Sequence, residues 1–239
     1  MEQPEILRSG DCALVAEFGK EIDEHTNALV HALDRAVRDK GIFGVRECVP
    51  TFRSLTVLFD PMLISGDRLE KKLLRLCKTL SAETQTQKTV VEVPVLYNGE
   101  DLQDVADYAK LSVEEVVRLH VSRDYRIYML GFLPGFVYLG GMDERIFCPR
   151  LTTPRTRIHA GAVGIGGEQT GIYPLPSPGG WRLIGTTPVR PYDAARTPPV
   201  LFSAGEYIRF VPIDEPAFDE IQKQVDAGVY VCRRTEGSV

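Results

Sequence analysis

The sequence predicts an α+β protein of two domains, a small α/β domain followed by a domain of many short strands. Residues 12–97 alternate strand-like runs with two amphipathic helical segments. Residues 125–213 instead hold short β-rich runs separated by glycine and proline. The chain has 239 residues, 44% hydrophobic and 26% charged, an ordinary globular composition that is long enough for two modest domains.

The first domain opens with a strand-like run over residues 12–18. A helix follows over residues 23–40, because its apolar residues recur on one face, and Gly41 ends it. The next two strand-like runs, 45–49 and 54–59, are joined by a short connection and read as a hairpin.

A second helix begins at Ser65 or Asp67, either of which can cap it, and the strand-like run 89–97 comes after it. The order over residues 12–97 is therefore β-α-β-β-α-β, the ferredoxin-like arrangement, in which two helices cover one face of an antiparallel sheet. Other groupings of these elements stay open. We expect this half to serve as a scaffold or as a partner-docking surface.

The boundary between the domains falls within residues 82–96. We set the first domain at 1–88 and the second at 89–239, with the polar stretch 81–88 as the linker candidate.

The second domain starts with two short helices, 101–110 and 112–121, and Ser112 and Glu115 form a capping box for the second of them. Many short strands follow, with glycine and proline turns that suggest a closed or nearly closed β-barrel. A last helix, capped by Asp214, ends the domain.

Composition argues against several classes of function. The net charge is -5 and the chain has no basic run, which argues against nucleic acid as a partner. No stretch of about 18 apolar residues is present to span a membrane, and residues 1–11 lack the features of a signal peptide. We expect a cytoplasmic protein that binds neither nucleic acid nor a membrane.

The cysteines give no sign of a cross-link or a metal site. They lie far apart without a C-x-x-C pair, so we predict neither a disulfide framework nor a zinc site, and no metal site of another kind. The five are Cys12, Cys48, Cys77, Cys148 and Cys232.

Function is expected in residues 131–188, which hold 12 of the 21 glycines, the only tryptophan, five arginines and no lysine. Glycines at this density let backbone approach backbone or ligand closely. The arginines face three acids within the segment, a local balance of +2, and guanidinium groups suit carboxylate or phosphate. The segment therefore predicts a site for a small anion.

Two groups of residues are candidates for that site. As acid or base we name the titrating pair His159 and Glu168, although a lone histidine in a barrel is more often structural. The substrate-binding candidates combine aromatic, amide, hydroxyl and guanidinium groups, which together suit a small polar ring or amide with a carboxylate. They are Arg150, Arg155, Gln169, Thr170, Tyr173, Ser177 and Trp181.

A packing interpretation of the same residues stays open. Tyr173 and Trp181 can be barrel-core aromatics, Gln169 can pin a turn, and Ser177 can be a turn residue between prolines. The chain has no G-x-x-x-x-G-K-[ST] loop, no dinucleotide fingerprint in the right context and no G-x-S-x-G elbow.

At these residues the chain resembles the family of 5-oxoprolinase B subunits (PxpB proteins), also described as allophanate hydrolase subunit 1 or KipI-type kinase inhibitors. Four motifs carry the resemblance in the family's order and spacing. They are GFLPGFVYL (131–139), PRLTTPR (149–155), AGAVGIGGEQTGIYP (160–174) and SPGGWRLIGTTP (177–188).

The resemblance implies a small α/β domain followed by a cyclophilin-like β-barrel. It also implies one component of a multi-component enzyme that hydrolyses 5-oxo-L-proline to L-glutamate using ATP at the level of the complex, with homologues of the A and C subunits of 5-oxoprolinase as partners. Such a component is not expected to be active alone. The substrate, a small anionic amide, agrees with the predicted site.

Two other functions stay open. One is a KipI-type inhibitor that binds a sensor histidine kinase, and the other is a carboxyltransferase-like component of a urea or allophanate pathway. The chain also departs from the family, which usually has proline in place of His159 and an arginine near Thr186.

Overall fold

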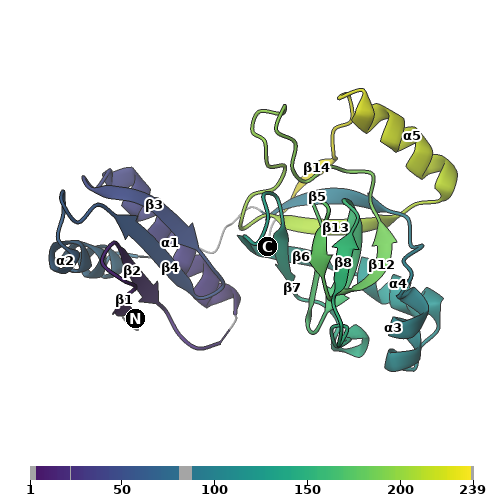
Figure 1. Ribbon diagram of the computed structural model, residues 1–239, viewed down its shortest axis with the longest axis horizontal. Helices are drawn as coiled ribbons and strands as arrows, with labels where there is room; N and C mark the ends of the chain where they lie inside the picture. Colours follow the sequence, from purple (N-terminus) through teal and green to yellow (C-terminus); the bar gives the residue numbers. More distant parts are fainter. Residues whose placement is uncertain (1–3, 22, 81–87, 238–239) are drawn as a thin grey trace. The chain divides into compact units, whose positions relative to one another are not determined.

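A computed structural model describes residues 4–21, 23–80 and 88–237, and the chain forms two compact units, Met1–Thr86 and Gln87–Val239 (Figure 1). Each unit has a hydrophobic core of its own. Most of the linker candidate 81–88 lies outside the described residues, so the predicted position of the domain boundary stays a prediction.

The first unit is a four-stranded antiparallel sheet in the order β1-β2-β4-β3. The buried residues of β2 and β4 alternate along each strand, so one face of the sheet packs against both helices. Ser65 caps the second helix and Gly41 ends the first, as predicted, with Gly41 in the left-handed conformation. Asp23, which the sequence prediction placed inside the first helix, is its N-cap. The elements are β1 (Glu5–Arg8), β2 (Ala13–Glu17), α1 (Glu24–Lys40), β3 (Val45–Pro50), β4 (Ser54–Phe59) and α2 (Gly66–Cys77).

One element of the predicted ferredoxin-like order is wrong. The strand predicted over 89–97 belongs to the second unit, and its place beside β2 is taken by β1, which the sequence analysis missed. The physical reason lies in the run from Lys88 to Val95, which buries residues on both faces and therefore needs cover on both sides.

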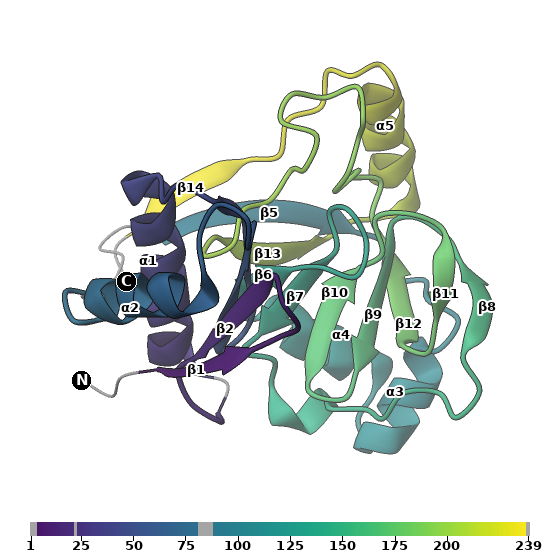
Figure 2. The same cartoon turned by 60° about the vertical axis from the view of Figure 1, so that its left-hand side comes forward.

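The second unit is a curled eight-stranded sheet in the order β12-β9-β10-β7-β6-β13-β5-β14 (Figure 2). Leu96, just after β5, pairs with Thr186 at the end of β12, so the sheet almost closes into the predicted barrel. The strands are β5 (Lys88–Val95), β6 (Asp124–Leu130), β7 (Val137–Gly140), β9 (Ala162–Gly166), β10 (Gln169–Ile172), β12 (Arg182–Thr186), β13 (Tyr207–Pro212) and β14 (Arg234–Gly237).

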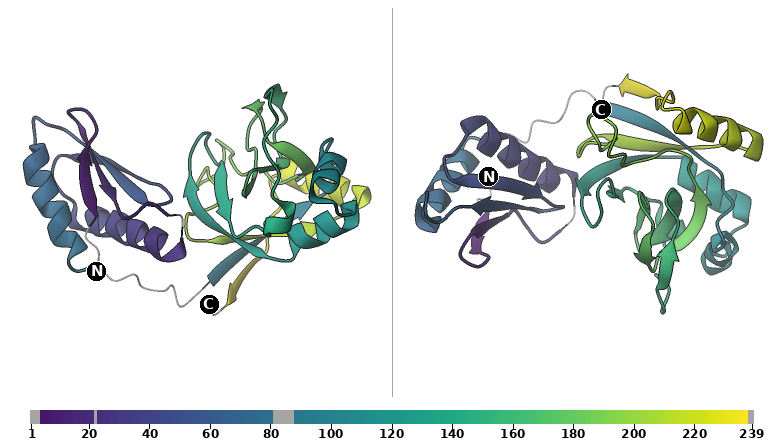
Figure 3. Two further views of the ribbon diagram at one scale, coloured as in Figure 1. Left: turned by 90° about the horizontal axis from the view of Figure 1, so that it is seen from below. Right: turned by 45° about the horizontal axis from the view of Figure 1, so that its top comes forward.

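The strand β5 lies next to the edge strand β14 of this sheet, parallel to β13 on one side and antiparallel to β14 on the other (Figure 3). A separate two-stranded ribbon pairs β8 (Arg155–Ile158) with β11 (Ser177–Gly179). The remaining elements are α3 (Leu102–Ala109), α4 (Val113–Val121), the 3₁₀ turn η1 (Glu144–Ile146) and α5 (Glu215–Asp226).

Both caps predicted for the second unit are present. Ser112 and Glu115 form the predicted capping box, and the Asp214 side chain caps α5. Asp101 precedes α3 without capping it, because its carboxylate accepts instead from Leu183 N at 2.7 Å and from Arg155 Nη2 at 2.7 Å. In the described part of the chain no helix combines the length and apolarity that crossing a membrane requires.

Candidate functional site

The four motifs of residues 131–188 converge on Trp181, which is 4% exposed. Phe136, from the β6–β7 loop, and Tyr173, from the end of β10, meet the indole edge-on at centroid distances of 5.5 and 6.0 Å. Leu151 N donates to Gly180 O at 2.7 Å and so fixes the 149–155 segment beside the tryptophan. Segments far apart in the sequence thus share one cluster.

The glycines of β9 and β10 make room for the indole. A Cβ added at Gly166 would lie 2.3 Å from Trp181 Cδ1, and one added at Gly171 would lie 3.0 Å from its Cζ3. The first distance leaves no room for a side chain and the second is tighter than an ordinary contact, so these strands favour glycine where the indole lies across them. Part of the glycine density therefore serves packing. Tyr173 and Trp181 are both core aromatics, as the packing interpretation expected.

Arg150 is the exposed cation of this cluster. Its guanidinium lies over the Trp181 ring, with Cζ 5.8 Å from the centroid, and no described carboxylate lies within 4 Å of it. Burial raises the pKa of the hydroxyls of Tyr138 and Tyr173, and the nearby charge of Arg150 opposes that rise. A guanidinium held on an aromatic face keeps its N–H edge available to an anion.

Two other arginines of the segment are neutralised by acids from elsewhere in the chain. Arg155 pairs with Glu100 at 2.9 Å and Asp101 at 2.7 Å, and Arg182 pairs with Asp104 at 2.7 Å. The local balance of +2 counted only acids within residues 131–188, and the fold adds three more from around the start of α3. A substrate anion at Arg155 would compete with two carboxylates already in place.

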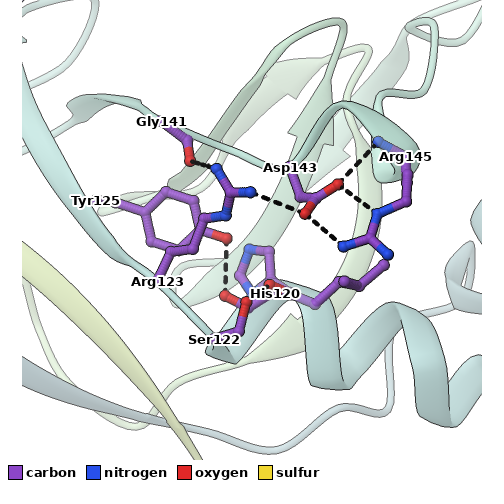
Figure 4. A network of polar contacts seen from close by, with 8 residues as sticks. His120, Ser122, Arg123, Tyr125, Gly141, Asp143 and Arg145 are labelled. Carbon is purple, nitrogen blue, oxygen red and sulfur yellow. Dashed lines mark hydrogen bonds and ion pairs between the residues drawn. The ribbon is translucent and has the colours of Figure 1, made fainter.

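Asp143 organises the arginines on a neighbouring turn (Figure 4). Its buried carboxylate accepts from Arg123 Nη2 at 2.9 Å and from Arg145 Nε and Nη2, both at 2.8 Å. The bonds from Arg145 hold the pKa of this carboxyl well below its usual range. Because its carboxylate is enclosed by these partners, the group ties η1 to the segment after α4 and is not open to a ligand.

Gln169 and Thr170 face opposite sides of β10. Gln169 pairs with Gly166, which contacts Trp181, so its half-buried side chain lies on the tryptophan side of the hairpin. Thr170 points into the barrel, where its Oγ1 donates to Gly164 O at 3.1 Å and lies 2.8 Å from His120 Nε2. The two predicted binding residues therefore do not share a site.

His120 is the buried polar residue that sequence analysis missed. Because Thr170 donates its hydroxyl proton to Gly164 O, His120 Nε2 must donate to Thr170, and Nδ1 then accepts from the Tyr97 hydroxyl at 2.7 Å. Full burial lowers the pKa of His120 to about 3, so the imidazole is neutral. Its position on the apolar face of the 112–121 helix, four residues after Val116, was the signal available in the sequence.

Ser177 lies in β11 opposite Ile158, a member of the Trp181 cluster. Its side chain is 7% exposed, and its Oγ has no hydrogen-bond partner among the described residues. A buried hydroxyl in a native protein normally has a partner, so this group is suited to a water molecule or a ligand atom.

His159 and Glu168 are both exposed and lie beyond opposite ends of β9, a strand about 13 Å long. His159 Nε2 is 3.1 Å from Thr186 Oγ1, whereas Glu168 is in the β9–β10 turn. The structure does not bring this predicted acid and base together.

The loop between β6 and β7 exposes an aromatic side chain through a strained turn. Phe132 has φ of 66°, and Leu133 N donates to Gly131 O at 2.8 Å, which makes a γ-turn of the uncommon hand. The phenyl group is 60% exposed, and its ring centroid is 5.4 Å from that of Phe136. The Trp181 cluster thus reaches the surface at Phe132 as well as at Arg150.

Two cavities lie away from the predicted site residues. One, of about 380 Å³, is lined by Arg190, Arg196 and Tyr230 among others, and one of about 260 Å³ lies in the first unit beside Lys40 and Lys72. Over the described ranges, no three His, Cys, Asp or Glu side chains gather as metal ligands would.

Comparison with known proteins gives a family match over most of the chain. The matching family is described as carboxyltransferase domain, subdomain C and D, and the match spans residues 4–202. The chain is 40% identical over 233 residues to the 5-oxoprolinase B subunit of Bacillus subtilis (strain 168), covering 92% of this chain and 97% of that protein. It is 36% identical over 219 residues to the 5-oxoprolinase B subunit of Escherichia coli O157:H7, covering 90% of this chain and 99% of that protein.

A solved structure supports the fold. The crystal structure of TTHA0988 is similar with a TM-score of 0.77 at 42% identity, over 85% of this chain and 40% of that one. The chain therefore spans about two fifths of the length of that structural relative.

Proposed function

The chain belongs to the carboxyltransferase domain, subdomain C and D, family, and from that membership we propose that it acts as the B subunit of an ATP-dependent 5-oxoprolinase. The carrying observation is the similarity to 5-oxoprolinase B subunits at 36% to 40% identity, because the alignments cover at least 90% of this chain and 97% of the relatives. A match of that extent includes both units and all four motifs around Trp181.

The proposed substrate is 5-oxo-L-proline, a five-membered lactam that carries a carboxylate. We assign the carboxylate to Arg150, because its guanidinium is exposed and has no carboxylate partner in the described part of the chain. Gln169, on the same side of the β9–β10 hairpin as Trp181, is placed to contact the lactam amide. Ser177 Oγ is a further candidate contact, since no described group bonds to it.

The remaining predicted residues take supporting roles in this proposal. Arg155 ties β8 to the turn before α3 through Asp101 and Glu100 and so positions the ribbon that carries Ser177. The Trp181 ring lies under the Arg150 guanidinium, and Tyr173 packs against that ring. His159 and Glu168 have no joint role as acid and base in this proposal, because β9 separates them.

The use of ATP belongs to the assembled complex in this proposal, with homologues of the A and C subunits as partners. Opening an unstrained lactam by hydrolysis is unfavourable enough to need coupling to phosphoryl transfer. The sequence has no G-x-x-x-x-G-K-[ST] loop, so we assign no nucleotide site to these residues.

The test is a reconstitution of glutamate release. This chain would be mixed with the homologues of the A and C subunits encoded in the same genome, 5-oxo-L-proline and ATP, and each protein would be omitted in turn. We expect release only when all three are present. Release at the same rate without this chain would overturn the proposal.

A further inference from the structure

The cavity of about 260 Å³ in the first unit lies far from the chemistry proposed above in sequence and in a different unit. It is formed where the end of α1, the following turn and one face of α2 come together. The lining residues are Lys40, Gly41, Ile42, Phe43, Lys72, Arg75 and Leu76.

The charged residues around this cavity are all cations. Lys40, Lys72 and Arg75 are exposed, and within the described ranges none has a carboxylate within 4 Å. Other arginines of the same unit are paired, as Arg46 is with Asp60 at 2.7 Å and Arg53 with Glu17 at 3.0 Å. The cavity therefore has a rim of positive charge that this unit does not neutralise.

The floor of the cavity is apolar, and large apolar side chains are exposed beside it. Ile42 is 9% exposed and belongs to the core, whereas the adjacent Phe43 is 73% exposed. The loop before α2 lies against this turn, since Asp60 N donates to Gly44 O at 2.8 Å, and it exposes Met62 and Leu63. Exposed large apolar side chains gathered beside a concave surface are typical of an interaction site.

We propose that this cavity docks an acidic segment of a partner protein of the complex, with one apolar side chain in the cavity and carboxylates paired to its rim. The inference rests on the proposed function, which supplies the partner proteins. The arrangement of charges favours a peptide over a free anion, because the cations stand at the rim while the floor is apolar. A flat membrane surface would leave the cavity unfilled, whereas a protruding side chain fills it.

The experiment measures the affinity of the two-unit chain for its homologues of the A and C subunits. The test variant reverses the rim charges, Lys40→Glu, Lys72→Glu and Arg75→Glu together. The control variant reverses three exposed cations that do not line the cavity, Arg35→Glu, Lys71→Glu and Lys78→Glu. We expect the rim variant to bind at least about tenfold more weakly than the control. The difference should shrink in about 1 M salt, where charges are screened within about 3 Å.

A second variant tests the apolar contact. Phe43→Ala removes an exposed ring, so folding should be preserved. We expect this variant to bind its partners more weakly than the unaltered chain, by a factor that does not change with salt concentration. Circular dichroism of each variant checks the fold.

The outcomes separate this inference from the proposed function. If the wild-type chain does not assemble with the two homologues, the proposed function loses its partners. If it assembles and the rim variant binds as tightly as the control, the docking inference is wrong while the proposed function stands. Loss of binding to phosphatidylglycerol vesicles in the rim variant, with assembly unchanged, would assign the surface to a membrane instead.

Discussion

Arginines close together in the sequence have different environments in the fold. Arg150 and Arg155 are five residues apart, yet the first lies on the Trp181 face and the second is held by two carboxylates. A guanidinium with satisfied charge positions the backbone, and one without a carboxylate partner can bind a ligand. The acids that decide between these roles are at the start of α3, outside the glycine-rich segment.

Replacing Arg150 tests the proposed carboxylate contact. In the reconstituted complex we expect Arg150→Ala to raise KM for 5-oxoproline by about 10- to 100-fold, because a hydrogen bond to a charged group is worth about 1.5–3 kcal/mol. Steady-state glutamate release measures it. Arg157→Ala, an exposed arginine of β8, is the control. Equal KM values for the two variants would remove Arg150 from the site.

His120 should make stability depend on pH. Its pKa is about 3 in the folded protein and near 6.5 when unfolded, so below pH 6.5 protons bind the unfolded state preferentially. The free energy of unfolding should be flat above that pH and fall by up to about 1.4 kcal/mol per pH unit below it. Urea unfolding between about pH 4.5 and 6.5 avoids most carboxyl titration.

The variant His120→Gln should lose much of this slope, whereas the exposed His159→Gln should keep it. An unchanged slope in His120→Gln would show that other groups titrate in this range.

At the scale of single residues, the sequence could predict which segment forms the Trp181 cluster but not which side chains contact one another. Tryptophan among glycines and arginines pointed to the Trp181 region. Asp101 contacts Leu183 across 82 residues and His120 contacts Thr170 across 50 residues, separations that local patterns do not encode.

The β9–β10 hairpin shows how one large side chain shapes an element. The indole of Trp181 lies where the side chains of Gly166 and Gly171 would be. Glycine weakens a strand, so the hairpin depends on the tryptophan to cover it.

Gly166→Ala should therefore displace the ring. A methyl group 2.3 Å from Trp181 Cδ1 overpacks the site, and we expect a loss of about 1–3 kcal/mol. Trp181 is the only tryptophan, so its fluorescence emission reports the change directly. Gly237→Ala adds a methyl group with no atom within 4 Å, so it should leave both the free energy of unfolding and the fluorescence emission unchanged. An unaltered emission in Gly166→Ala would contradict the packing described for the indole.

The sequence predicts helices with strong periodicity, but it does not predict the sheet to which a strand belongs when that depends on distant partner strands. The caps at Ser65, Ser112 and Asp214 follow from local chemistry. The sheet to which residues 88–95 belong depends on β13 and β14, far along the chain. The run of valines there indicated a strand buried on both faces, which a four-stranded sheet covered by helices on one face could not provide.

For the whole molecule, each unit has its own core, which predicts separable unfolding. Leu55 is 0% exposed in the first unit, and Leu55→Ala should cost about 2–5 kcal/mol there. We expect the denaturation midpoint seen by Trp181 fluorescence to stay constant while part of the circular dichroism signal is lost earlier. Ile127→Ala, in the second core, should move the fluorescence midpoint. A common shift of both signals by Leu55→Ala would show that the units unfold as one.

The position of β5 between β13 and β14 sets the order of events when the chain is made. This strand leaves the ribosome early, but its neighbour β13 begins at Tyr207 and β14 at Arg234. At a synthesis rate of about 5–20 residues per second, the valine-rich strand β5 stays unpaired for on the order of ten seconds until its partner strands have been made. The first unit, complete by then, can fold while translation continues. Nascent chains of this protein should therefore engage chaperones through residues 88–95 rather than through the first unit.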